Sequence, residues 1–225
     1  MKPIKICIAI ALLFIVVQRS YTQDFVNLNF ESANVSGYSP VNYIPINAAL
    51  PSWAAYYGYS NNPTYSGAPV LYDGRSLGGA LIILEDTNAP NYFGPLPIQG
   101  NYSVLLEGSI PFSGTSASIG QTGTIPVTAQ SLTFYLGNTF GVLQVTFNGQ
   151  PLSIMDISNT LNYTIWGADI SAYAGQTGQL LFTAPVNTSA LLDNIEFSTL
   201  PVPEPSELAV VTLGALLLGY RRWRI

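Results

Sequence analysis

The sequence has no histidine and a single cysteine, Cys7. A catalytic site built on His or Cys, a Cys/His zinc site and a disulfide framework are therefore excluded. Charge is also scarce, because charged residues make up 8% of the 225 residues, against about 25% in an average protein. Between residues 23 and 200, ten side chains are acidic and only Arg75 is basic. This balance excludes nucleic acid and anionic lipid as partners.

Residues 1–22 have the three parts of a secretory signal peptide. Lys2 and Lys5 precede twelve apolar residues at 6–17, and a polar stretch that includes Thr22 follows. Twelve residues extend only about 18 Å as a helix, which is short of the roughly 30 Å hydrocarbon core. We therefore expect signal peptidase to cleave near Thr22 and the chain to be exported. The alternative is an uncleaved membrane anchor.

The last 25 residues, 201–225, form a second unusual segment. A proline-containing motif, Val202-Pro203-Glu204-Pro205, precedes a mainly apolar run at 208–220 and a basic end with Arg221, Arg222 and Arg224. The prolines break regular structure before the run, which predicts a short transmembrane helix at 208–220. Arginines after that helix favour a cytoplasmic C-terminus.

This tripartite C-terminus resembles the PEP-CTERM sorting signal of Gram-negative bacteria. The resemblance implies an exosortase, a membrane transpeptidase, as the processing partner, with cleavage near the Pro-Glu-Pro motif. It also implies that the exported protein is transiently anchored in the inner membrane through its C-terminal helix. Release to the cell envelope, the cell surface or the extracellular matrix would follow, with an association with exopolysaccharide. The alternative is an ordinary single-pass anchor.

Residues 23–200 predict one all-β domain, an antiparallel β-sandwich of jelly-roll type. Short runs of β-branched and aromatic residues are separated by Gly, Pro and Asn, which is typical of strands. We expect strands at Val26–Phe30, Ala80–Leu84, Tyr102–Glu107, Leu132–Leu136, Leu143–Phe147, Tyr163–Trp166, Leu180–Thr183 and Leu191–Phe197. Asn148-Gly149 predicts a type I′ hairpin turn after the strand that ends at Phe147.

Four stretches of this domain resemble secreted jelly-roll modules of PEP-CTERM proteins and, more loosely, carbohydrate-binding modules. They are Leu50–Trp53, Gly100–Leu106, Ile170–Thr177 and Leu192–Ile195. In such carbohydrate-binding sandwiches, an acidic residue near the first strand and one on the last strand bind a structural calcium ion. The resemblance therefore implies Glu31 and Asp193 as calcium ligands.

Asp193 also draws attention by its position alone. Strand alternation places it on the same face as Leu191, Ile195 and Phe197, so we expect a buried carboxylate that needs a partner. Calcium is one such partner. The alternatives are backbone N–H groups and a salt bridge with Arg75.

An aromatic-rich stretch at 53–72 is the candidate glycan-binding site. Flat rings beside amide and carboxylate groups suit the C–H face and the hydroxyls of a sugar. The candidate residues are Trp53, Tyr56, Tyr57, Tyr59, Tyr65 and Asp73. Packing of these rings under a loop and self-association through tyrosine are the alternatives.

The sequence predicts a non-catalytic function, that of an exported surface or matrix protein that contacts extracellular polysaccharide. The alternatives are a self-associating or protein-binding adhesive module and, third, a small glycan-active enzyme. No His, and no Lys after residue 22, is available to activate a serine nucleophile. A glycosidase needs two carboxylates at a defined distance in a cleft. Candidate carboxylates are present, but the sequence does not indicate which two would pair: Glu85, Asp86, Glu107 and Asp169.

Overall fold

The computed structural model of the chain describes residues 24–59, 62–89, 94–111 and 113–202. The predicted signal peptide, the sorting residues from Pro203 onward and the predicted helix at 208–220 lie outside these residues. Within the described ranges, no helix is long and apolar enough to cross a membrane. Val202, the first residue of the sorting motif, is half-buried next to Gly167.

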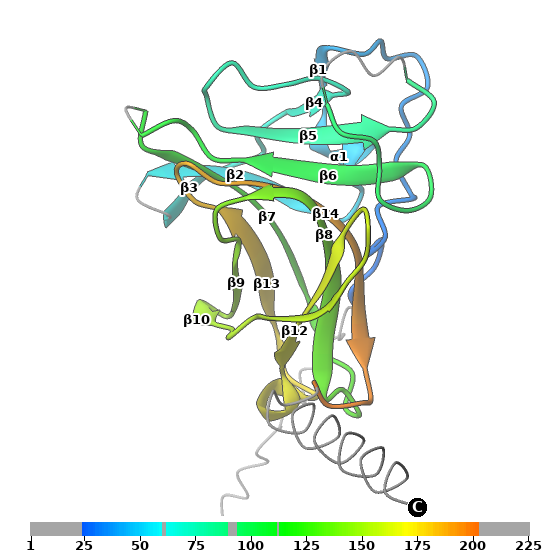
Figure 1. The fold of residues 1–225 in the computed structure, drawn as a ribbon, viewed down its shortest axis with the longest axis vertical. Helices are drawn as coiled ribbons and strands as arrows, with labels where there is room; N and C mark the ends of the chain where they lie inside the picture. The colour runs from blue at the N-terminus through cyan, green and yellow to red at the C-terminus, as the bar shows by residue number, and fades with distance from the viewer. Residues whose placement is uncertain (1–23, 60–61, 90–93, 112, 203–225) are drawn as a thin grey trace, which may run out of the picture.

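Two β-sheets face each other, which confirms the predicted all-β sandwich (Figure 1). The larger sheet has the order β1 (Asn42–Ile44), β4 (Val70–Tyr72), β5 (Leu81–Asp86), β6 (Tyr102–Glu107), β14 (Ser189–Ser198), β8 (Ser131–Phe140), β12 (Thr164–Asp169) and β11 (Met155–Asn159). The smaller sheet has the order β10 (Gln150–Pro151), β9 (Gln144–Phe147), β13 (Thr177–Ala184), β7 (Thr115–Thr124), β2 (Ala54–Tyr59) and β3 (Asn62–Ser66). A single helical turn, α1 (Ile46–Ala49), and a 3₁₀ turn at Ser171–Tyr173 complete the described elements.

The main core lies between the sheets and is built from large apolar side chains of both. Phe134 of β8 meets Phe182 of β13 edge to face, with ring centroids 5.4 Å apart. Both rings are fully buried. Such pairs add about 0.5–1.5 kcal/mol beyond the burial of their area.

The predicted hairpin around Asn148-Gly149 is confirmed. Asn148 and Gly149 both have positive φ, 49° and 75°, as a type I′ turn requires. The turn joins β9 to β10, with Phe147 paired to Gln150.

The structure differs from the expected strands in two places: one predicted strand is absent, and one strand was not predicted. Residues 26–30 form turns instead of a strand, because Asn27 and Phe30 both adopt positive φ. The ten-residue strand β7 was not expected, although it pairs with both β2 and β13. Its residues, TSASIGQTGT, are small and polar, so no hydrophobic alternation marks it.

Candidate functional site

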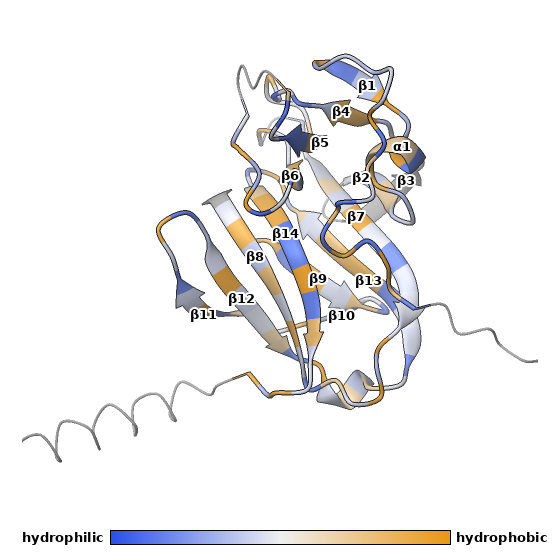
Figure 2. Ribbon diagram, turned by 90° about the vertical axis from the view of Figure 1, so that its right-hand side faces the viewer, coloured by the Kyte–Doolittle hydropathy of each residue, from blue (hydrophilic) through white to orange (hydrophobic). Residues whose placement is uncertain are grey.

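A row of polar residues crosses the outer face of the larger sheet. Strand pairing places Glu85 of β5 opposite Ser103 of β6, and Asp193 of β14 opposite Tyr135 of β8. Asp73 follows β4 and donates its backbone N–H to the carbonyl of Leu84, 2.8 Å away, which brings it beside Glu85. We call this set the carboxylate row: Asp73, Glu85, Ser103, Asp193 and Tyr135. Figure 2 colours the end of β5 and the middle of β14 as hydrophilic.

The carboxylate row is next to a small apolar cluster on the same outer face. This cluster comprises Leu71, Ile83, Leu105 and Leu191, with Ile98 packed against it. Ile98 belongs to the segment 94–101, which covers the sheet at this point. The outer face is therefore buried here, although it belongs to the solvent side of a two-layer sandwich.

Segment 94–101 contacts the carboxylate row through its backbone. A Cβ at Gly94 would overlap both carboxylate oxygens of Glu85. The backbone N–H of Ile98 donates to Ser103 Oγ at 2.8 Å, and that of Gln99 donates to Asp193 Oδ2 at 3.0 Å. The contacts thus follow the row from β5 toward β14.

Asp193 is 1% exposed and is held by three hydrogen bonds. Its Oδ2 accepts from the Ser103 hydroxyl at 2.7 Å and from the Gln99 N–H, while its Oδ1 accepts from the Asn194 N–H at 2.7 Å. Of the alternatives in the sequence, backbone N–H groups are therefore confirmed as partners, and Arg75 is not among them. Among the described residues, Oδ1 accepts only this one hydrogen bond, which leaves one lone-pair direction without a donor there.

The expected burial of Asp193 and its shared face with Leu191 are confirmed, but its grouping with Ile195 and Phe197 was wrong. Leu192 pairs with Leu136 and lies in the main core, so Leu191 and Asp193 lie on the outer face. A bulge then shifts the register between Asp193 and Glu196, and Asn194 takes a positive φ of 42°. The bulge turns Ile195 into the main core. Simple alternation could not reveal this reversal, because a bulge inserts a residue into the pattern.

Glu31 lies near Asp193, as the resemblance implied. Its Oε1 accepts the N–H groups of Asn101 and Tyr102 at 2.8 and 3.0 Å, and its Oε2 accepts from Asn101 Nδ2 at 3.1 Å. Gly100 packs so tightly against Glu31 that a Cβ there would overlap Oε1. Oε2, like Asp193 Oδ1, keeps one lone-pair direction free.

A pocket of about 220 Å³ lies between the two carboxylates. Besides Glu31 and Asp193, it is lined by Asn29, Gln99, Gly100 and Asn194. Every one of these residues carries a side-chain or backbone oxygen. Among the described residues, no group of three or more His, Cys, Asp or Glu side chains could hold a metal ion, so a metal here would need amide and carbonyl ligands too.

Burial, with a smaller contribution from the charge of Glu31, raises the pKa of Asp193 to about 6 against the hydrogen bonds from Ser103, Asn194 and Gln99. Burial also raises the pKa of Glu85 to about 8, with the charges of Asp73 and Glu107 acting in the same direction. The pKa of Asp73 is raised by burial and by the charge of Asp86. The row therefore disfavours negative charge along its length.

The aromatic stretch at 53–72 forms a hairpin, and its first ring is not available to a ligand. Trp53 is 5% exposed, packs against Phe30 and Phe182, and donates Nε1–H to the Asn27 carbonyl at 3.0 Å. The prediction that Trp53 binds a glycan is therefore wrong, because the face of its ring packs in the core.

The other members of that candidate site have different environments. The Tyr57 hydroxyl accepts the Ile82 N–H at 3.1 Å, and the Tyr56 hydroxyl accepts from Gln179 Nε2 at 2.9 Å. Asp73 is buried in the carboxylate row, away from solvent. The side chains of Tyr59 and Tyr65 lie outside the described part of the chain.

Of the carboxylates considered for glycoside hydrolysis, Glu85 and Asp86 lie on opposite faces of the larger sheet, whereas Glu85 and Glu107 lie on the same face. Asp86 lies on the inner side of β5, where its Oδ2 accepts the Tyr72 hydroxyl at 2.7 Å. Glu107 accepts the Ser76 N–H at 3.0 Å. Asp169 accepts the Ser171 N–H at 2.9 Å and lies in β12, toward the other edge of the larger sheet. No two of these four carboxylates line the same pocket among the pockets of the described residues.

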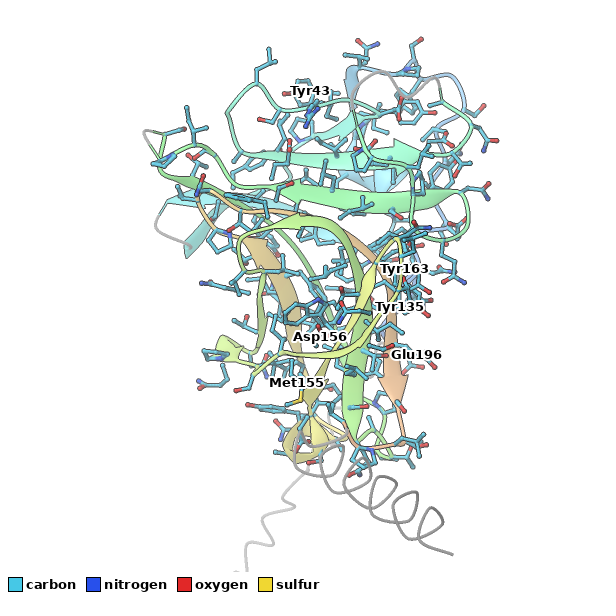
Figure 3. The ribbon with its side chains drawn as sticks, viewed as in Figure 1. Tyr43, Tyr135, Met155, Asp156, Tyr163 and Glu196 are labelled. Atoms are coloured by element: carbon cyan, nitrogen blue, oxygen red, sulfur yellow. The ribbon has the colours of Figure 1, made fainter. Side chains whose placement is uncertain are left out.

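A stacked tyrosine pair, formed by Tyr135 of the carboxylate row and Tyr163, was missed from the sequence. The rings of Tyr135 and Tyr163 lie 4.5 Å apart and nearly parallel, at 15°. Figure 3 shows them on the face that also presents Glu196. The signal was weak because Tyr135 lies in β8 and Tyr163 lies just before β12, so only the pairing of these two strands brings the rings together.

No family model and no curated protein matches the chain. Among solved structures, it is similar to an apo form cyclase from Fischerella sp., with 14% identity, a TM-score of 0.38 and coverage of 77% of this chain and 93% of that one. A Stig cyclase from Fischerella sp. TAU, crystallised with an indole compound, gives 12% identity, a TM-score of 0.39 and coverage of 77% and 94%. The enzymatically active domain of tailspike protein 4 of bacteriophage CBA120 gives 12% identity, a TM-score of 0.40 and coverage of 79% of this chain and 21% of that one.

These matches correct the function expected from the sequence. All three structures are titled as cyclases or as an enzymatically active domain, and none of the three is titled as a matrix or exopolysaccharide-binding protein. At TM-scores below 0.5, the matches carry no argument for an activity of this chain, and the expectation that it is not an enzyme stays a prediction.

Proposed function

We propose that the chain is a calcium-binding β-sandwich domain in which Glu31 and Asp193 hold the ion. The observation that carries the proposal is the pocket between these two carboxylates. They are far apart in the sequence, yet each has a carboxylate oxygen that accepts only one hydrogen bond from the described residues.

The residues around the pocket suit calcium better than other common metals. Ca²⁺ takes six to eight oxygen ligands from carboxylates, amides, backbone carbonyls and water. Two carboxylates, the side-chain oxygens of Asn29 and Asn194, and the backbone of Gln99 and Gly100 offer this mixture. The absence of His and the single Cys argue against zinc.

A cation would also relieve the electrostatics of the site. The charge of Glu31 raises the pKa of Asp193, and Arg75, the only basic residue between 24 and 202, is exposed and is not a partner of either carboxylate. The ion would join three segments: the turn at Glu31, segment 94–101 and β14. Calcium would therefore act mainly by stabilising the fold.

Calcium should raise the melting temperature of the chain after treatment with EDTA. At a free concentration of 100 times the dissociation constant, the gain is about 2.7 kcal/mol, which corresponds to about 5–10 °C for a domain of this size. Asp193→Asn and Glu31→Gln should each reduce the rise by the part that this site contributes, because each removes a charged ligand. Differential scanning calorimetry with and without CaCl₂ measures the effect.

Glu196→Gln is the matched control, since Glu196 is an exposed carboxylate on the same strand. It should show the full calcium response. A melting temperature that calcium does not change in the unmodified chain would refute the proposal, and so would an undiminished response in Asp193→Asn.

The jelly-roll connectivity is part of the same proposal. The chain passes from the larger sheet at β6 to the smaller at β7, returns at β8 and crosses again at β9. Repeated crossing between facing sheets supports a jelly roll.

The terminal segments are proposed as addresses, with signal peptidase and an exosortase as partners and an exported, transiently membrane-anchored route. The support is their residue pattern. The secreted form should begin near residue 23 and end near Pro203–Pro205, as read from intact mass. Recovery of the full-length chain from the cytosol would contradict this prediction.

A further inference from the structure

Two buried carboxyl groups meet at the end of the carboxylate row that is farther from Glu31. Strands β4 and β5 are parallel, with Leu71 opposite Ile83 and Tyr72 opposite Leu84. The next residues along each strand are Asp73 and Glu85, and their carboxyl groups are close enough to interact directly. Glu85 is 0% exposed and Asp73 is 2% exposed.

By hydrogen-bond geometry, none of the four carboxylate oxygens has a partner in the described part of the chain, although the two carboxyl groups and the Asp86 backbone N–H are close enough to shift one another's pKa. The nearest candidate donors are already committed. The Ser103 hydroxyl, opposite Glu85 in the sheet, donates to Asp193. The Tyr72 hydroxyl donates to Asp86 on the other face of β5. Two buried carboxylates without donors are costly unless a positive charge compensates them.

The protein supplies little positive charge here. The Arg75 side chain is exposed, and its lowering of the Glu85 pKa is the smallest of the named influences, while the charge of Glu107 acts in the opposite sense. The Asp86 backbone N–H favours the ionised form of Asp73 but the Asp86 charge opposes it. The groups around the pair therefore leave it in need of a compensating positive charge, which a proton on Glu85 or a bound cation supplies.

Gly94 adds an independent geometric feature. Its backbone covers Glu85, and a Cβ at this position would overlap both Glu85 oxygens. Any other residue would push the carboxylate away from its present position. The Gly94 backbone therefore closes the site over the pair without placing a side chain in it.

We propose that Asp73 and Glu85 together bind a hard divalent cation of the calcium class, at a second site separate from Glu31 and Asp193. Oxygen-only donors define that class of ion. The unpartnered oxygens of both side chains would become its ligands. This inference does not depend on the first site, because the two pairs share no ligand.

Stoichiometry tests the second site directly. The full chain is stripped with EDTA, titrated with CaCl₂ at pH 8 and followed by isothermal calorimetry and native mass spectrometry. We expect two bound ions in the unmodified chain, one in the Asp73→Asn/Glu85→Gln variant and one in the Glu31→Gln/Asp193→Asn variant. The amides preserve size, and circular dichroism verifies that each variant is folded.

Each result separates the two sites. If Asp73→Asn/Glu85→Gln binds as many ions as the unmodified chain, the second site is refuted, whatever the other variant does. If only Glu31→Gln/Asp193→Asn is unaffected, the proposed function fails while the second site stands. Gly94→Ala provides a further measure: it should weaken the second site at least tenfold and leave the first unchanged. An unchanged affinity there would also overturn the proposal.

Discussion

Trp53→Ala should destabilise the protein by about 3–5 kcal/mol, the usual cost of removing a buried aromatic side chain. Trp53 fills the space between Phe30 and Phe182, with ring centroids 5.6 and 6.3 Å away. Its Nε1–H bond to the Asn27 carbonyl would also be lost. Because Phe30 precedes Glu31, the same change should loosen the proposed calcium site. Urea denaturation followed by fluorescence of the remaining aromatic residues measures the loss.

Tyr43→Ala provides the control for aromatic truncation. Tyr43 is 58% exposed, so its removal should change stability by less than about 0.5 kcal/mol. If Trp53→Ala leaves the free energy of unfolding unchanged, the placement of Trp53 in the core is wrong. That result would instead favour the prediction that the Trp53 ring contacts a ligand.

Without divalent metal, the free energy of unfolding should fall as the pH rises from about 4.5 to about 8. The pKa of Glu85 is raised from 4.5 to about 8 in the folded protein. Below pH 4.5 both states carry the proton, and between the two values only the folded state does. Folding then loses up to about 1.4 kcal/mol for each pH unit, or up to about 5 kcal/mol over the whole interval. Asp193, raised from 3.8 to about 6, adds to the fall at the acidic end.

Glu85→Gln should flatten this pH dependence between pH 6 and 8, because the amide carries no proton to lose. Thermal melts in EDTA at half-unit steps of pH provide the measurement, and exposed Glu196→Gln should retain the slope of the unmodified chain. Saturating CaCl₂ should also reduce the slope, since the cation takes the place of the proton. The same slope in Glu85→Gln as in the unmodified chain would show that burial of this carboxyl group is not its cause.

Local sequence signals predicted the strands that carry large apolar residues. The run at Tyr102–Glu107 forms β6 with the same bounds, and Leu132–Leu136 lies within β8. The hairpin turn at Asn148-Gly149 was predictable because positive φ at two successive residues favours that pair. Strand β7 was not, because small polar residues are buried there only by neighbouring strands on both sides.

The candidate site was predictable in part. The resemblance to carbohydrate-binding sandwiches paired Glu31 with Asp193, and the structure places both at one pocket. The assignment of Asp73 to an aromatic sugar site missed its real neighbour, Glu85. Their contact depends on a parallel pairing of β4 with β5, which short-range patterns do not specify.

The amino-acid sequence by itself determined the composition of the domain: an acidic, histidine-free β-protein with apolar segments at both ends. Tertiary structure alone decided which carboxylates are buried and which of them meet. The bulge after Asp193, the covering segment 94–101 and the register of β4 on β5 each depend on contacts between distant parts of the chain. Those contacts remove water from the carboxylates, and the loss of water is what raises their pKa and favours a bound cation.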